Sequence, residues 1–227
     1  MSTFTKTTTG GWSPQGCMPA HLQAMLTEEG LTAEDYALAF LQLVRLLKTQ
    51  RRTGWLDHDI TECESIADHM YRMGIISMVA DTATRTLDTD RCVKIALVHD
   101  IAEALVGDIT PFDKHVGKEE KHERELMTIE YLCELIQPYN AAYSRELLEL
   151  WLDYEEIRTD EARLVKDIDK FEMIQQAYEY EVQYGGTIDL DQFFNARASI
   201  KTVEIGRLCD RVLQRREKFW QSVKKQA

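Results

Sequence analysis

Two histidines and two aspartates are the residues of this chain whose types could together hold a metal ion: His69, His99, Asp100 and Asp169. Imidazole nitrogens and carboxylate oxygens in one set suit a borderline or hard divalent cation such as Mn²⁺, Co²⁺, Mg²⁺, Fe²⁺ or Zn²⁺. Four protein ligands can leave coordination positions open, and such a cation can bind a phosphate and activate a water. The set therefore indicates metal-assisted hydrolysis.

The central part of this set lies in a segment, residues 93–107, that is apolar on most sides and is expected to form one buried helix. His99 and Glu103 stand four residues apart, and Asp100 and Glu103 stand three apart, so a helix would turn one imidazole and two carboxylates to the same side. Buried charges are costly unless they are paired or bound to a ligand. The glycine that closes the segment would let the chain turn, with Asp108 at the exit.

Each residue of the set also has a purely structural interpretation. A lone buried histidine such as His69 is more often a hydrogen-bonded core residue than a ligand. Asp169 could be a solvated helix charge, yet it flanks the apolar stripe of its helix, whereas Asp167 lies further round. Spacing alone leaves both interpretations open.

The composition of the 227-residue chain excludes several classes of partner. Its net charge of −12 makes it a poor candidate for binding nucleic acid by phosphate neutralisation. No apolar run reaches the ~20 residues that a transmembrane helix needs, and the first twenty residues lack the apolar core of a secretory signal. The five cysteines are scattered and odd in number, which favours reduced thiols. We therefore expect no nucleic acid, no membrane, and a cytoplasmic location, with the nucleus as the alternative.

Helical patterns dominate the chain from about residue 33, and alternating strand patterns are nearly absent, so the expected fold is all-α. The segment from Ser65 to Asp68 resembles a capping box that opens a helix. Asp90 is expected to cap the next helix, and Thr159 to start one that runs to about Tyr184.

The chain is expected to have three parts. Residues 1–32 form a loosely ordered N-terminal extension, with residues 1–20 disordered or loosely attached. Residues 33–190 form the main domain, which includes helices over 119–136 and 144–157. Residues 191–227 form one last helix with a basic end that packs on the domain.

The histidines and aspartates follow the order H…HD…D, and with their flanking segments they resemble the HD-domain metal-dependent phosphohydrolases. The resemblance is closer still to the HD-domain 5′-deoxynucleotidases, the HD domain-containing protein 2 group. The shared segments are residues 52–55, 64–73, 96–103, 106–109, 118–122 and 164–173. H…HD…D alone identifies the superfamily, whereas the Arg-Thr-Gly-Trp and Gly-Asp-Ile segments in this order are more specific.

The resemblance implies an HD-domain helical bundle with an internal metal site, whose ligands are His69, His99, Asp100 and Asp169. It implies one or two divalent cations per chain, Mn²⁺, Co²⁺ or Mg²⁺ in the first place and Fe²⁺, Ni²⁺ or Zn²⁺ as alternatives. It also implies a homodimer, a small-molecule deoxynucleotide as substrate, and hydrolysis of deoxyribonucleoside 5′-monophosphates to deoxyribonucleoside and phosphate.

Three further positions have two possible roles by resemblance. Glu103, Asp108 and the backbone carbonyl of Ile109 could hold a second cation. Alternatively, Glu103 moves a proton as the catalytic acid or base, and Asp108 accepts a hydrogen bond from the 3′-hydroxyl of the sugar.

Two residues of the Arg-Thr-Gly-Trp segment are assigned to substrate binding. Arg52 would grip the phosphate with its fork of donors, although spacing cannot choose between Arg52 and Arg51. Trp55 is either a core anchor or a wall against the sugar that excludes a 2′-hydroxyl by shape. Lys114 or Lys118 could also reach the phosphate from a loop.

Two other functions stay open at this point. The first is an HD phosphohydrolase or phosphodiesterase that acts on another nucleotide. Cyclic or multiply phosphorylated nucleotides would need a longer basic groove than the sequence indicates. The second is a non-catalytic HD scaffold that binds metal, against which the intact set of candidate residues argues.

Overall fold

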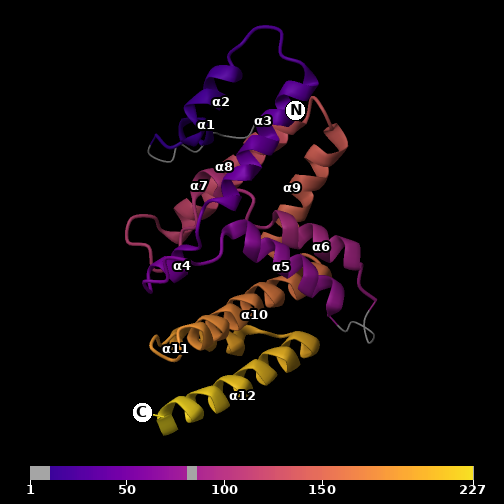
Figure 1. Ribbon diagram of the computed structural model, residues 1–227. Coiled ribbons are helices and arrows are strands. Elements are labelled where there is room, and N and C mark those ends of the chain that lie inside the picture. Colours follow the sequence, from indigo (N-terminus) through magenta and orange to yellow (C-terminus); the bar gives the residue numbers. More distant parts are fainter. Residues whose placement is uncertain (1–10, 81–85, 227) are drawn as a thin grey trace. The chain divides into compact units, whose positions relative to one another are not determined.

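A computed structural model describes residues 11–80 and 86–226, and all regular structure in these ranges is helical (Figure 1). The prediction of an all-α chain is confirmed. The first ten residues, part of the segment expected to be disordered, lie outside the described ranges. None of the described helices is long and apolar enough to cross a bilayer. The chain divides into two compact units, Met1–Asp68 with Asp100–Trp151, and His69–His99 with Leu152–Ala227.

The first unit is built around three longer helices, with α3 packed against α8. A capping box starts α3: the Thr32 hydroxyl accepts from the Asp35 amide, and the Asp35 carboxylate accepts from the Thr32 amide. Its helices are α1 (Pro14–Cys17), α2 (Ala20–Met25), α3 (Ala33–Val44), η1 (Arg45–Lys48), α4 (Thr53–Leu56), α7 (Glu103–Val106), α8 (Lys118–Ile136) and most of α9 (Ala141–Glu156).

The described part of the N-terminal extension is more ordered than expected. Helix α1 packs against α7 and α8. Met18 and Leu22 are buried, and the Tyr131 hydroxyl lies 3.0 Å from the Met18 sulfur. Burial of these apolar side chains explains why the segment is ordered despite its polar start.

A closed loop between η1 and α5 presents the Arg-Thr-Gly-Trp segment. Its two ends are joined by an isolated antiparallel bridge between Arg51 and Ser65. The predicted capping box is present: the Ser65 hydroxyl accepts from the Asp68 amide at 3.1 Å, and the Asp68 carboxylate accepts from the Ser65 amide at 2.8 Å. Helix α5 (Ile66–Val79) follows directly.

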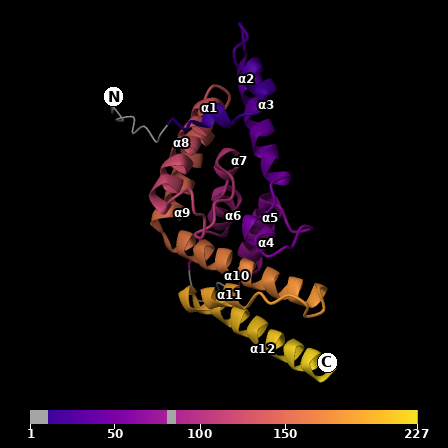
Figure 2. The ribbon, with the colours of Figure 1, turned by 90° about the vertical axis from the view of Figure 1, so that its left-hand side faces the viewer.

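The second unit is organised on the long helix α10 (Asp160–Gln183), against which α6 (Thr89–Val98) packs. Helix α12 (Val203–Gln226) runs alongside α10 in both ribbon views (Figures 1 and 2). Thr159 caps α10 as predicted. The predicted cap of α6 was wrong by two residues, because Asp88 and not Asp90 accepts from the amide of Arg91.

The expected single helix at the C-terminal end is three elements, α11 (Asp191–Phe194), η2 (Asn195–Ser199) and α12. A break precedes α12 because the buried carboxylate of Asp167 accepts from the amides of Lys201 and Thr202 at 2.8 and 2.7 Å. Near the other end of α10, the fully buried Glu181 accepts from Arg216 and from the Trp220 indole. Two buried carboxylates therefore attach α12 to α10.

The segment 93–107 is not the continuous helix that its composition predicts. Helix α6 ends at Val98, and α7 begins at Glu103. Between them the chain makes a tighter turn, in which the Glu103 amide bonds to the Asp100 carbonyl at 3.0 Å. The Nδ1 atom of His99 lies 3.0 Å from the Ala96 carbonyl at the point where α6 ends. His99 and Asp100 therefore lie at a helix end and not within a helix.

Candidate metal centre

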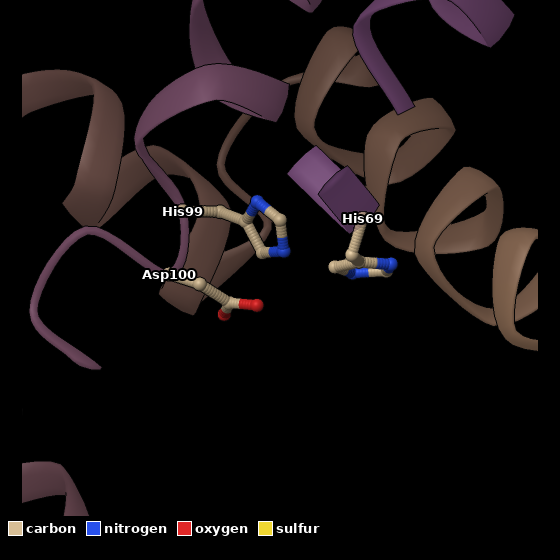
Figure 3. A group of neighbouring side chains, drawn as sticks. All are labelled: His69, His99 and Asp100. Atoms are coloured by element: carbon tan, nitrogen blue, oxygen red, sulfur yellow. The ribbon is translucent and has the colours of Figure 1, made fainter. Parts of the chain in front are cut away.

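His69, from α5, and His99 and Asp100, from the end of α6 and the turn after it, form a group that could hold a metal ion. Each residue offers one ligand atom, and these atoms all lie within 4.8 Å of one another. Figure 3 shows the side chains of His99 and Asp100 directed toward His69. Both histidines are buried, with exposed fractions of 0% and 3%.

Both imidazole rings are held through Nδ1. The Nδ1 atom of His99 lies 3.0 Å from the carbonyl of Ala96, and that of His69 lies 2.5 Å from Oε2 of Glu172. A carbonyl and a carboxylate only accept hydrogen bonds, so Nδ1 carries the proton in each ring. With the proton on Nδ1, the lone pair of an uncharged imidazole is on Nε2, which is the atom that would bind a metal ion.

Asp169 lies beside His69 on the second unit. Its Oδ1 is 3.3 Å from Nε2 of His69, and its Oδ2 accepts from the hydroxyl of Tyr154 at 2.7 Å. Tyr154 also packs against the ring of His99, with centroids 4.7 Å apart. Asp169 is thus next to the histidine nitrogen, and its side chain keeps 27% of its surface exposed.

Two residues that support this centre escaped the sequence analysis. Glu172 is fully buried, and besides His69 it accepts from the Nε of Arg72 at 2.8 Å. Arg72 reaches on to Glu179 at 2.6 Å. The sequence contains a spacing that could have identified both residues. Glu172 stands three residues after Asp169, and Arg72 three after His69, so each lies about one helical turn from a candidate ligand.

The two arginines before α4 have different partners, which distinguishes their roles. Arg51 donates to the backbone carbonyl of Cys63 and so closes the loop. Arg52 places Nη1 3.4 Å from Oδ2 of Asp100, and both side chains are partly exposed, at 16% and 17%. Of the two, Arg52 is the one beside a candidate metal ligand.

Glu103 is buried, with a side chain 3% exposed, and lies beside a lysine. The Nζ atom of Lys121 is 3.4 Å from Oε1 of Glu103 and 2.8 Å from the carbonyl of Ile109. Burial, and then the charges of Asp100 and Asp108, raise the pKa of Glu103 well above its usual range, while Lys121 opposes the shift. A carboxyl group in this setting is suited to proton transfer.

Asp108 follows a reversal of the chain at Gly107, whose φ of +83° is one that residues with a side chain rarely adopt. Its Oδ2 accepts from the amide of Thr53 at 2.7 Å. This hydrogen bond joins the Gly-Asp-Ile segment to the start of α4 and leaves Asp108 further lone pairs as acceptors.

Trp55 is 1% exposed and ranks among the largest buried side chains of the described residues. Its indole Nε1 donates to Glu64 at 2.9 Å. The ring is therefore packed and fixed in orientation, as expected of a core anchor.

The donor set fits a divalent cation. Two imidazoles with Nε2 as the acceptor, and carboxylates beside them, form the mixed nitrogen and oxygen environment that such ions prefer. Partners on Nδ1 of both rings, which metal-binding histidines almost always have, are present as well.

Comparison with known proteins assigns the chain to a protein family. The HD domain family matches residues 44–207, and the chain belongs to this family. The 5′-deoxynucleotidase YBR242W of Saccharomyces cerevisiae is 52% identical over 210 residues, which are 92% of this chain and 86% of that protein.

Two further relatives agree with this assignment. The 5′-deoxynucleotidase HDDC2 of Xenopus laevis is 43% identical over 180 residues, 79% of this chain and 87% of that protein. The solved structure of HD domain-containing protein YGK1 superposes with a TM-score of 0.70 at 40% identity, covering 92% of this chain and 99% of that chain. The resemblance to the HD-domain 5′-deoxynucleotidases is confirmed.

Proposed function

We propose that this chain is a metal-dependent 5′-deoxynucleotidase, a phosphomonoesterase that converts deoxyribonucleoside 5′-monophosphates to deoxyribonucleosides and phosphate. The observation that carries the proposal is the pair of buried imidazoles, each with Nδ1 beside a hydrogen-bond acceptor, and the carboxylates beside them. The names of relatives at 43–52% identity supply the substrate class.

His69, His99, Asp100 and Asp169 would hold the divalent cation, with Mn²⁺, Co²⁺ or Mg²⁺ the first candidates. When bound, a divalent cation neutralises phosphate charge and lowers the pKa of water enough to supply a nucleophile near neutral pH. Hydrolysis of a phosphate monoester needs little more than such positioning and charge neutralisation.

Arg52 would bind the phosphate. Its guanidinium is partly exposed and lies 3.4 Å from the carboxylate of Asp100, so a phosphate held there would be next to a metal ligand. The planar fork of donors matches two phosphate oxygens, which a single ammonium group cannot do. Arg51 is assigned no substrate role because it donates to the backbone.

Glu103 would move the proton that the reaction transfers between water and the leaving 5′-oxygen. Asp108 would accept a hydrogen bond from the 3′-hydroxyl with the lone pairs that Thr53 does not use. Trp55, held by Glu64, would bound the sugar site on the side of the 2′-carbon. A rigid boundary is what discrimination by shape requires, because apolar contact alone rejects an added hydroxyl weakly.

We also propose that the enzyme is a homodimer in the cytoplasm or nucleus. The resemblance is the basis for the dimer, and the scattered cysteines, none of them paired in the structure's described residues, agree with a reducing compartment. Sedimentation of the purified protein and imaging of a tagged chain test these two statements.

Phosphate release from a matched substrate panel tests the proposed activity. The panel contains deoxyribonucleoside 5′-monophosphates, the corresponding ribonucleotides, 3′-monophosphates and a cyclic nucleotide. Chelated protein is resupplied with Co²⁺, Mn²⁺ or Mg²⁺ in turn. Release that returns with metal and is confined to 5′-deoxy substrates is the expected result. Turnover of other nucleotides would reassign the chain to another HD phosphohydrolase class, and no turnover with metal bound would make it a scaffold.

A further inference from the structure

Phe112 is the most exposed of the large hydrophobic side chains in the part of the chain that the structure describes, with 79% of its surface accessible. It lies in the loop between α7 and α8, residues 107–117. A phenylalanine in water forgoes the stabilisation that burial would give it. Loops next to an active site often carry the residues that contact substrate, and an exposed ring in such a loop is suited to that role.

The backbone holds Phe112 in a defined turn. The amide of Asp113 donates to the carbonyl of Thr110 at 3.1 Å, which makes Pro111 and Phe112 the central residues of a β-turn. Proline is favoured at the first central position because its φ is fixed. A second turn follows, in which Oδ1 of Asp113 accepts from the amide of His115 at 2.7 Å. The ring of Phe112 is therefore carried by a hydrogen-bonded backbone.

The loop begins at the proposed substrate site. Asp108, its second residue, accepts from the amide of Thr53 at the start of α4 at 2.7 Å, and Figure 1 shows the loop beside α4. Both roles that the resemblance gives Asp108, a cation ligand or an acceptor for the 3′-hydroxyl, place it at the substrate. Four residues span at most about 14 Å, and the turn at 110–113 shortens this distance, so Phe112 lies within reach of a molecule bound at Asp108.

Exposure increases from the metal centre to this loop. The side chain of Glu103 is 3% exposed and that of Asp100 is 17% exposed, whereas Phe112 is 79% exposed. A nucleotide whose phosphate lies at the buried end would therefore carry its base toward the solvent end. The residues proposed for the phosphate and the sugar leave this base without a partner.

We propose that Phe112 is a base-binding residue, whose ring stacks on the face of the nucleobase once the phosphate is held at the metal centre. This role deepens the proposed function and rests on it. Each of the four bases has a π-face, so stacking tolerates all of them, and purines bind more tightly than pyrimidines because their rings offer more contact area. Selection among substrates then comes from the sugar and the phosphate and not from the identity of the base.

Phosphate release from dGMP and from 2-deoxyribose 5-phosphate, which lacks the base, tests the proposal. In Phe112→Ala, kcat/KM for dGMP should fall about five- to thirtyfold, the loss of one stack between a base and an aromatic ring, while kcat/KM for 2-deoxyribose 5-phosphate stays unchanged. Phe112→Trp keeps an aromatic face and should keep the wild-type kcat/KM for dGMP. Tyr139→Ala is the matched control, because it removes another exposed aromatic ring, 57% accessible and located after the end of α8, and should alter neither substrate. An unchanged kcat/KM for dGMP in Phe112→Ala, or an equal loss for both substrates, would overturn the proposal.

Fluorescence of Phe112→Trp separates the base contact from the proposed activity. In the presence of Mg²⁺, dGMP stacked on the introduced indole should quench its emission, whereas 2-deoxyribose 5-phosphate should leave the emission unchanged. Wild-type protein in the same titration corrects for the four native tryptophans. Quenching by dGMP without phosphate release from the wild type would refute the proposed activity and keep the base contact. Phosphate release without quenching would refute the base contact and keep the activity, and the absence of both would refute both.

Discussion

Replacing Glu172 by glutamine tests how the protein prepares His69 for metal. The carboxylate of Glu172 accepts from Nδ1 of His69 on one oxygen and from Nε of Arg72 on the other. Glutamine has the same shape, and its carbonyl can still accept from Arg72. Its amide group then faces Nδ1 and can only donate, which moves the ring proton to Nε2 and removes the lone pair that binds metal.

The size of the effect follows from this geometry. The positive charge of Arg72 already offsets much of the negative charge of Glu172, so removing that negative charge should itself change metal affinity little. Metal affinity falls because the proton of the His69 ring moves to Nε2. Outer partners of this kind are worth 10–100-fold in metal affinity or activity, which corresponds to about 1.4–2.7 kcal/mol. We expect Glu172→Gln to bind Co²⁺ 10–100-fold more weakly than the wild type.

The assay is titration of chelated protein with Co²⁺ in competition with a chelator of known affinity. Thermal unfolding of the metal-free protein shows that the fold is retained. Glu179→Gln is the matched control, because Glu179 lies on the same helix and binds the same arginine, yet its bonds go to Arg72 and Gln175. Equal Co²⁺ affinity in Glu172→Gln and Glu179→Gln would refute the reasoning.

Three other predictions concern the rest of the chain. Asp100→Ala or Asp169→Ala should abolish phosphate release with the fold largely kept, and full activity in either variant would remove that residue from the metal set. Trp55→Phe keeps an aromatic core side chain but loses the bond to Glu64, so the ratio of deoxy- to ribonucleotide kcat/KM should fall; an unchanged ratio would exclude Trp55 from sugar selection. Glu181→Ala removes the buried acceptor of the partly exposed Arg216 and Trp220 side chains and should lower the free energy of unfolding by about 1–3 kcal/mol in denaturant titration, with kcat unchanged.

Local patterns predicted the helices that carry their own start signals. Thr159 before two acidic residues, and Ser65 before Asp68, both cap helices as expected. In each case the donor and acceptor lie within three residues, so the sequence contains the whole interaction. The metal set came from the family resemblance, and in the structure Oδ1 of Asp169 lies 3.3 Å from Nε2 of His69.

Features that depend on distant partners were not predictable in this way. Asp167 was placed further round the helix than Asp169, yet Asp167 is the buried one, because amides 34 and 35 residues away bind it. The apolar composition of residues 93–107 predicts one continuous helix and does not indicate the turn at His99. The sequence offered Lys114 or Lys118 as lysines that could reach the phosphate and gave no reason to place Lys121 beside Glu103, where the structure has it. These choices are made by packing between segments, which outweighs local preference.

The attachment of α12 changes where the functional domain ends. A chain that stopped at residue 190, the boundary drawn from sequence, would lack every donor that α12 and the residues before it provide to Asp167 and Glu181. The two carboxylates, buried on the helix that also carries Asp169 and Glu172, would then lose these partners and face water. For anyone who prepares a shortened protein, the smallest piece worth expressing therefore runs through Trp220.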